Sequence, residues 1–159
     1  MRRALLLSCT ALLLAGCGRS DDDLRRMIRE EIGRRADRTY YTDAQVYGPY
    51  SPAVKAGRFL FVSGQIGADP VTMELVGTDV AAQTRQALTN LTTLLNKAGY
   101  DSSDVVQCTV FLRDMKEFSR MNLIYGGFFA DGKYPTRTTV EVSSLPKDAL
   151  VEISAIAMK

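Results

Sequence analysis

Hydrophobic side chains recur at helical spacing in two stretches of the chain. In residues 79–98, apolar positions three and four apart form one face, which predicts an amphipathic helix with Thr78 or Asp79 as its N-cap. Residues 115–130 carry aromatic and branched side chains on one face, which predicts a second helix. Two glycines at 126–127 fall inside this second pattern, and we interpret them as a close-packing site.

Stretches rich in branched and aromatic residues predict strands around these helices. They are residues 58–66, 105–113, 137–145 and 150–158, preceded by one further strand. The order β, β, α, β, α, β, β predicts an α+β sheet with both helices on one face. The helices leave the other face of the sheet uncovered. The strands contain too many apolar residues for both faces to remain exposed to water, namely Phe59, Phe61, Val105, Val140, Val142 and Ile153. We therefore expect self-association to cover the second face.

The first 16 residues have the layout of an export signal, with two arginines, an apolar run and two small residues. The run is too short to span, as a helix, a bilayer core of about 30 Å. The tetrapeptide Leu-Ala-Gly-Cys that ends at Cys17 resembles the bacterial lipobox, in which cleavage precedes an acylated cysteine. We therefore expect an exported, membrane-anchored lipoprotein that faces the periplasm or the cell exterior. The alternative is an ordinary signal peptide with an incidental cysteine.

Residues 17–38 form a segment dominated by charge. Arginine and acidic side chains balance over residues 21–38, and Leu24 and Ile28 belong to only a thin apolar stripe. We interpret the segment as a solvated tether with a helical tendency, in which Asp23 caps a short helix. A helix lying on the membrane surface is the alternative, weakened because the acids offset the attraction of arginine to anionic lipid.

Composition excludes several kinds of chemistry. The chain has no His, so it has no Ser-His-Asp triad, Cys-His dyad or HExxH zinc site. Of 20 Lys and Arg residues, 18 remain after loss of residues 1–16, against 18 Asp and Glu. A net charge near zero argues against nucleic acid as a partner. With Cys17 acylated, Cys108 is the one free thiol, and we expect it to be buried as a small apolar residue.

Two charged residues of the predicted strands are candidates for chemistry. Arg137 opens a strand at the expected edge of the sheet, where a guanidinium can bind a carboxylate through two parallel hydrogen bonds. An ordinary surface arginine is the alternative. Glu152 lies in the most apolar strand. It is either on the solvent face of that strand or partly desolvated, with a raised basicity suited to general-base catalysis.

Seven blocks of sequence carry a resemblance to a known family. They are GPYSPAV (48–54), SGQI (63–66), DVAAQTRQALTNL (79–91), TVFLRDM (109–115), MNLIYGGFF (121–129), YPTRTTVEV (134–142) and LPKDALVEISAIA (145–157). In this order and spacing they resemble the RidA/YjgF family of enamine and imine deaminases. The resemblance covers residues 43–159, which is essentially the whole of the predicted domain at 39–159. It implies a chorismate-mutase-like mixed sheet and a homotrimer whose sheets form an inner barrel, with active sites in the clefts between subunits.

The same resemblance implies catalytic roles for three residues. Arg137 matches the arginine that binds the substrate carboxylate in this family. Glu152 matches the acid that, with a main-chain carbonyl, orients the attacking water. Tyr50 matches a tyrosine that lines the cleft.

It also implies substrate-binding roles for Ser63, Asn122 and Thr139. Ser63 is the serine of the SGQI block, and Asn122 matches an asparagine that braces the site. The family often has Cys where this chain has Thr139. A main-chain contact from that position survives the change, whereas a role that needs a thiol is in doubt.

The implied reaction is hydrolysis of 2-aminoacrylate-type enamines, or their imine tautomers, to 2-keto acids and ammonia in the cell envelope. An imine carbon is already electrophilic, so the site must only hold the carboxylate, place one water and transfer protons. No metal or cofactor is therefore expected. A non-catalytic module that binds small carboxylates in the same cleft is the alternative. Ribonuclease or chaperone activity, also ascribed to relatives, is not supported by the charge or by the absence of His.

Overall fold

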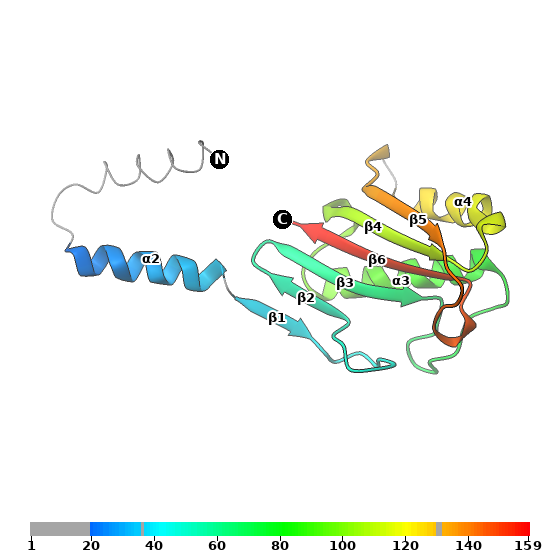
Figure 1. The fold of residues 1–159 in the computed structure, drawn as a ribbon, viewed down its shortest axis with the longest axis horizontal. Coiled ribbons are helices and arrows are strands. Elements are labelled where there is room, and N and C mark those ends of the chain that lie inside the picture. Colours follow the sequence, from blue (N-terminus) through cyan, green and yellow to red (C-terminus); the bar gives the residue numbers. More distant parts are fainter. Residues whose placement is uncertain (1–19, 36, 130–131) are drawn as a thin grey trace. The chain divides into compact units, whose positions relative to one another are not determined.

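The computed structural model describes residues 20–35, 37–129 and 132–159 of the chain (Figure 1). Helix α2 (Asp21–Arg35) belongs to one compact unit, and Arg38–Lys159 form the other. The predicted export signal and the predicted acylation site, Cys17, lie outside the described residues.

Helix α2 begins at a reciprocal cap. The Ser20 hydroxyl accepts a hydrogen bond from the Asp23 N–H (3.2 Å), and the Asp23 carboxylate accepts one from the Ser20 N–H (3.3 Å). The expected cap at Asp23 is therefore wrong, because Asp23 lies inside the first turn and Ser20 occupies the cap position. Exposed ion pairs such as Arg26 with Asp23 add little stability. In the described parts of the chain, no helix is both long and apolar enough to cross a bilayer.

The domain is built on one six-stranded sheet. Its strands are β1 (Arg38–Tyr41), β2 (Ala53–Ala56), β3 (Phe59–Ile66), β4 (Val105–Leu112), β5 (Thr136–Glu141) and β6 (Val151–Met158). They lie in the order β1-β2-β3-β6-β4-β5, and β4 and β5 are the parallel pair of an otherwise antiparallel sheet. Strand β1 was not predicted, because none of its residues is buried and no alternation marks it.

Two helices, α3 (Val80–Lys97) and α4 (Phe118–Phe128), cover one face of the sheet (Figure 1). This confirms the predicted α+β fold. Asp79 is the N-cap of α3, where its carboxylate accepts two backbone hydrogen bonds of 2.9 and 3.0 Å. Helix α4 is shorter than predicted, because residues 115–117 form a separate 3₁₀ turn. The close-packing interpretation of glycines 126–127 is wrong, since a Cβ at either would meet nothing within 4 Å.

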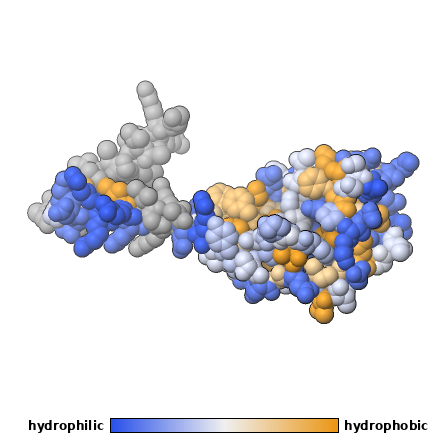
Figure 2. All heavy atoms as spheres, turned by 60° about the horizontal axis from the view of Figure 1, so that its bottom comes forward, coloured by the Kyte–Doolittle hydropathy of each residue, from blue (hydrophilic) through white to orange (hydrophobic). Residues whose placement is uncertain are grey.

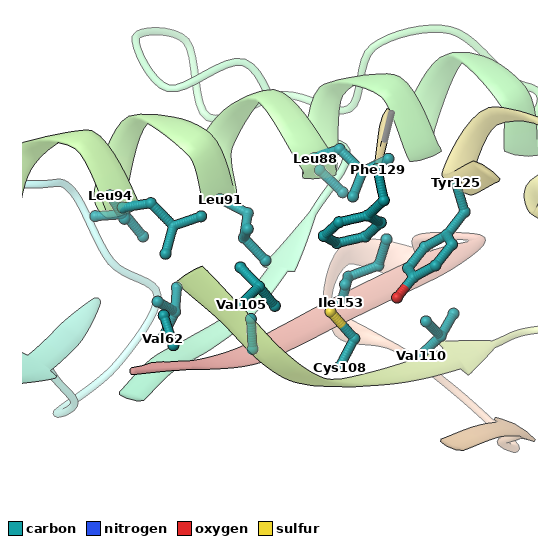
Figure 3. Packing of buried hydrophobic residues seen from close by; sticks show 14 of the residues in the cluster. Val62, Leu88, Leu91, Leu94, Val105, Cys108, Val110, Tyr125, Phe129 and Ile153 are labelled. Atoms are coloured by element: carbon teal, nitrogen blue, oxygen red, sulfur yellow. The ribbon is translucent and has the colours of Figure 1, made fainter. Parts of the chain in front are cut away.

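The core lies between the sheet and the two helices. Along β6 every second residue is fully buried against them, beginning with Val151 and Ile153. Figure 3 shows the leucines of α3 above the strands, with Ile153 and Cys108 below them. Cys108 is a free thiol with no exposed surface, as predicted.

The end of β3 is tied closely to α3. A Cβ at Gly67 would lie 2.4 Å from the Cα of Gln83, so only glycine permits this approach. The Asn90 side chain donates hydrogen bonds to the carbonyls of Ile66 (3.2 Å) and Ala68 (2.8 Å). These contacts fix the position of the β3 end, which forms part of the cavity described below.

The opposite face of the sheet is left open by the helices. Phe59, Phe61 and Val140 lie there with 42%, 45% and 38% of their surface exposed. Figure 2 shows apolar side chains at the domain surface among polar ones. Val105 and Ile153 point into the core instead, so they do not contribute to this face. Val142 packs into a small second cluster around Leu145 and Ile66.

Candidate functional site

A cavity of about 720 Å³ opens beside the end of β3. The loop between β1 and β2 supplies Tyr47 and Tyr50 to its wall, β3 supplies Ser63 and Gly64, and β6 supplies Glu152. Three of the predicted site residues, Tyr50, Ser63 and Glu152, therefore meet in one cavity.

Strand β3 bulges where it passes Glu152. Its register with β6 shifts between Val62 and Gln65, which inserts one extra residue. A Cβ at Gly64 would lie 1.8 Å from Oε1 of Glu152. The carboxylate thus fills the space that any side chain at position 64 would need. The group that closely approaches the backbone of Gly64 is therefore the Glu152 carboxylate.

The carboxylate of Glu152 is half-buried on the open face of β6. Among the residues that the structure describes, it has no hydrogen-bond or ion-pair partner. Burial raises its pKa above the ordinary value of 4.5, because a partly desolvated carboxylate resists ionisation. Glu152 is therefore a stronger base than an exposed glutamate, and no neighbouring cation weakens it.

Ser63 braces the loop that carries Tyr50. Its hydroxyl donates a hydrogen bond to the Ser51 carbonyl (2.7 Å), and its N–H donates to the Pro52 carbonyl (2.9 Å). The hydroxyl proton is thus engaged within the chain, and the lone pairs of Ser63 Oγ remain as acceptors. The Tyr50 side chain is 44% exposed at the mouth of the cavity.

Tyr47 forms a wall of the cavity that the sequence did not predict. Its hydroxyl donates to the Met73 carbonyl (3.0 Å), which also accepts from Nζ of Lys147 (2.8 Å). The Lys147 ammonium lies 5.6 Å from the centre of the Tyr47 ring. Both Met73 (φ 61°) and Lys147 (φ 57°) adopt the left-handed backbone conformation. No motif or periodic pattern marks Tyr47, because its partners lie 26 and 100 positions further along the chain.

Arg137 lies on the helix-facing side of the edge strand β5, in register with the buried Cys108. Its guanidinium carbon lies 4.5 Å from the centre of the Tyr125 ring on α4. Thr139 faces the same way, in register with Val110, and its buried hydroxyl lacks a partner among the described residues. Asn122 is exposed on α4.

The Glu152 cavity and the Arg137 side chain are separated within one chain. Strand β4 lies between β6 and β5, which places the two outer strands about 10 Å apart. Glu152 also points to the open face, whereas Arg137 points to the helix side. The cavity wall does not include Arg137, Thr139 or Asn122. One chain therefore cannot bring both charged groups around one small molecule.

Comparison with known proteins agrees with the fold and with the predicted family. The model of the family described as endoribonuclease L-PSP matches residues 42–159. The chain belongs to this family. A RutC family protein of Pyrococcus horikoshii is 54% identical over 112 residues, which are 70% of this chain and 88% of that protein.

Two further relatives carry informative names. The 2-iminobutanoate/2-iminopropanoate deaminase of Bos taurus is 44% identical over 112 residues, 70% of this chain and 81% of that protein. The crystal structure of E. coli TdcF with bound serine is similar at 38% identity with a TM-score of 0.70, covering 79% of this chain and 94% of that one. The resemblance to the RidA/YjgF family is thereby confirmed.

Replacing Glu152 with glutamine is expected to stabilise the fold near neutral pH. Burial raises the pKa of Glu152 in the folded state. Glu152 therefore contributes its full stability below the unfolded-state pKa of 4.5, where it is protonated, and this stability is lost as the pH rises through the folded-state pKa. Glutamine does not ionise, so the glutamine side chain loses no stability as the pH rises. Thermal denaturation should give Glu152→Gln a higher Tm than the wild type at about pH 7, and the difference should vanish towards about pH 4.

The control for this prediction is Glu30→Gln, because Glu30 is exposed on α2. Its Tm should equal that of the wild type at both pH values. A Glu152→Gln protein that is no more stable than the wild type near neutral pH would contradict the desolvation of this carboxylate.

Proposed function

We propose that the protein hydrolyses 2-imino acids, and the enamines in equilibrium with them, to 2-keto acids and ammonia. The observation that carries the proposal is the half-buried Glu152 carboxylate, which lies against the backbone of Gly64 in a cavity and has no partner among the described residues. A relative 44% identical is named as a 2-iminobutanoate/2-iminopropanoate deaminase, and TdcF binds serine, which carries the same carboxylate as such substrates.

The reaction follows from the basicity of Glu152. An enamine first takes a proton on its terminal carbon and becomes an iminium ion, which is the protonated imine. Water then adds to the imine carbon as Glu152 accepts a proton from it, and the C=N electron pair moves to nitrogen. Glu152 returns the proton to the amino nitrogen of the resulting carbinolamine. As the C–N bond breaks, the hydroxyl gives its proton to Glu152, and the keto group and ammonia remain. A raised pKa suits both steps, because Glu152 must take up and release a proton near neutral pH.

Arg137 would hold the substrate carboxylate. A guanidinium matches a carboxylate through two parallel hydrogen bonds, and this fixes the orientation of a molecule with few other polar groups. Within one chain Arg137 lies on the far side of β4 from Glu152. We propose that a neighbouring subunit supplies the second charged group, in a homotrimer that also covers the exposed residues Phe59 and Phe61.

Paired measurements on Arg137 and Glu152 variants test the enzyme against a carboxylate-binding module. Arg137→Ala should weaken pyruvate binding by about 100-fold or more in calorimetry, because two charge-assisted hydrogen bonds are lost. Arg137→Lys should restore little, since an ammonium lacks the planar fork. Glu152→Gln should bind pyruvate nearly as the wild type does but hydrolyse imine about 100-fold more slowly or worse.

The imines for this assay are made in situ by an amino-acid oxidase, and their loss is followed. If Glu152→Gln hydrolyses imine at the wild-type rate, the proposed role of Glu152 is wrong. If the wild type binds pyruvate through Arg137 yet accelerates no imine hydrolysis, the protein is a binding module.

The shared site predicts complementation between two inactive variants. In a trimer, each site would take Arg137 from one chain and Glu152 from its neighbour. Refolding Arg137→Ala and Glu152→Gln chains together in equal amounts should then recover about a quarter of the wild-type activity, because every mixed trimer contains one intact site. Each variant refolded alone is the control and should stay inactive. No recovery, despite mixed oligomers detected by mass spectrometry, would contradict the shared site.

We propose further that the protein is anchored in the cell envelope through an acylated Cys17. The proposal rests on the sequence pattern of residues 1–17 alone. Cys17→Ser should move the protein out of the membrane fraction or leave an uncleaved precursor, with unchanged activity of the folded domain. Cys9→Ser, within the apolar run, is the control and should remain in the membrane fraction. A Cys17→Ser protein that is cleaved and still membrane-bound would contradict the anchor.

A further inference from the structure

Two aromatic rings of α4 hold the guanidinium of Arg137. Its Cζ lies 4.5 Å from the centre of the Tyr125 ring and 5.6 Å from that of Phe118. The two rings are seven residues apart, which is two helical turns, so they share one face of α4. Tyr125 is 3% exposed and Phe118 is partly buried against the core, so neither ring moves freely.

No anion neutralises this guanidinium within the described parts of the chain, and none of its N–H groups donates a hydrogen bond there. A carboxylate partner would accept the N–H bonds that lie in the plane of the guanidinium, here called the fork, and would neutralise its charge. Aromatic faces attract a cation without accepting its N–H bonds in the plane of the fork. The rings therefore stabilise the charge of Arg137 and leave its donors available to a ligand.

From this geometry we infer that Phe118 and Tyr125 are positioning residues for the carboxylate-binding arginine. They hold the Arg137 guanidinium in an orientation that leaves its fork free for a substrate carboxylate. The inference rests on the proposed function in assigning Arg137 to the substrate, and it adds the pair of residues that prepares Arg137 before the substrate arrives.

The ring of Tyr125, and not its hydroxyl, carries this role. The hydroxyl is buried beside the Cys108 thiol (Figure 3) and has no hydrogen-bond partner of acceptable geometry among the described residues. Tyr125→Phe keeps the aromatic face and removes only this unsatisfied hydroxyl. It should therefore retain the pyruvate affinity of the wild type, whereas Tyr125→Leu should lose affinity.

Stepwise fluorination of Phe118 separates the electrostatics of the ring from its packing. Fluorine withdraws electron density from the ring face and weakens its attraction for a cation, with little change of shape. We expect the Kd of the full chain for pyruvate, measured by calorimetry in detergent, to rise with each added fluorine. The total rise should be about three- to tenfold for trifluorophenylalanine.

The matched control is the same fluorinated series at Phe128, which lies on the same helix and packs against the same core. Among the described residues, the cation–π contacts of Arg137 are with Phe118 and Tyr125 and not with Phe128. Pyruvate affinity should not change along that series. The inference is overturned if fluorination at Phe118 leaves the Kd unchanged, if both positions respond equally, or if the wild type does not bind pyruvate. Calorimetry requires no turnover, so the two claims can fail separately. If the wild type binds pyruvate but hydrolyses no imine, the proposed enzymatic function is wrong, whereas the inferred role of the two rings is unaffected.

Discussion

The candidate site depends on the alternation of side chains along β6. This strand lies between β3 and β4, and Val151, Ile153 and Ala155 are buried under the helices. The residues between them must point the other way, so Glu152 reaches the open face. A shift of β6 by one residue would place its carboxylate in the core and its apolar side chains in water. The packing that stabilises the fold therefore also fixes the position of the Glu152 carboxylate, and the bulge at Gly64 brings the β3 backbone against it.

The same sheet keeps the two charged groups apart. Had Arg137 and Glu152 shared one face of one chain, they would attract each other, and the cation would lower the pKa of the carboxylate. Their separation by β4 leaves Glu152 basic and Arg137 available. Partial burial keeps Glu152 basic without an ion pair, and aromatic faces stabilise the charge of Arg137 without neutralising it. In the proposed shared site, the substrate would be the first group to bridge them.

Local sequence signals predicted most of the fold and less of the site. Helix α3 was predicted nearly to its ends, because a capping Asp79 and a regular apolar face are local properties. Strand β1 was missed, since its pairing with β2 is the only feature that defines it. Glu152 and Arg137 were predicted from the sequence. The contacts of Tyr47 with Met73 and Lys147, and the aromatic rings that pack against Arg137, were not predicted. Those depend on residues brought together from distant strands, helices and loops by the fold.

The exposed apolar surface and the separation of Arg137 from Glu152 both favour association of subunits. Phe59, Phe61 and Val140 keep 42%, 45% and 38% of their surface in water when the chain is alone, and burying that remainder stabilises an assembly by about 1 kcal/mol each. If the same association brings Arg137 of one chain to Glu152 of the next, the site cannot form in an isolated subunit. Assembly and activity would then share one dependence on protein concentration. Anchoring chains to a membrane would favour this association by raising their local concentration, which gives the proposed lipid anchor a physical consequence for the proposed reaction.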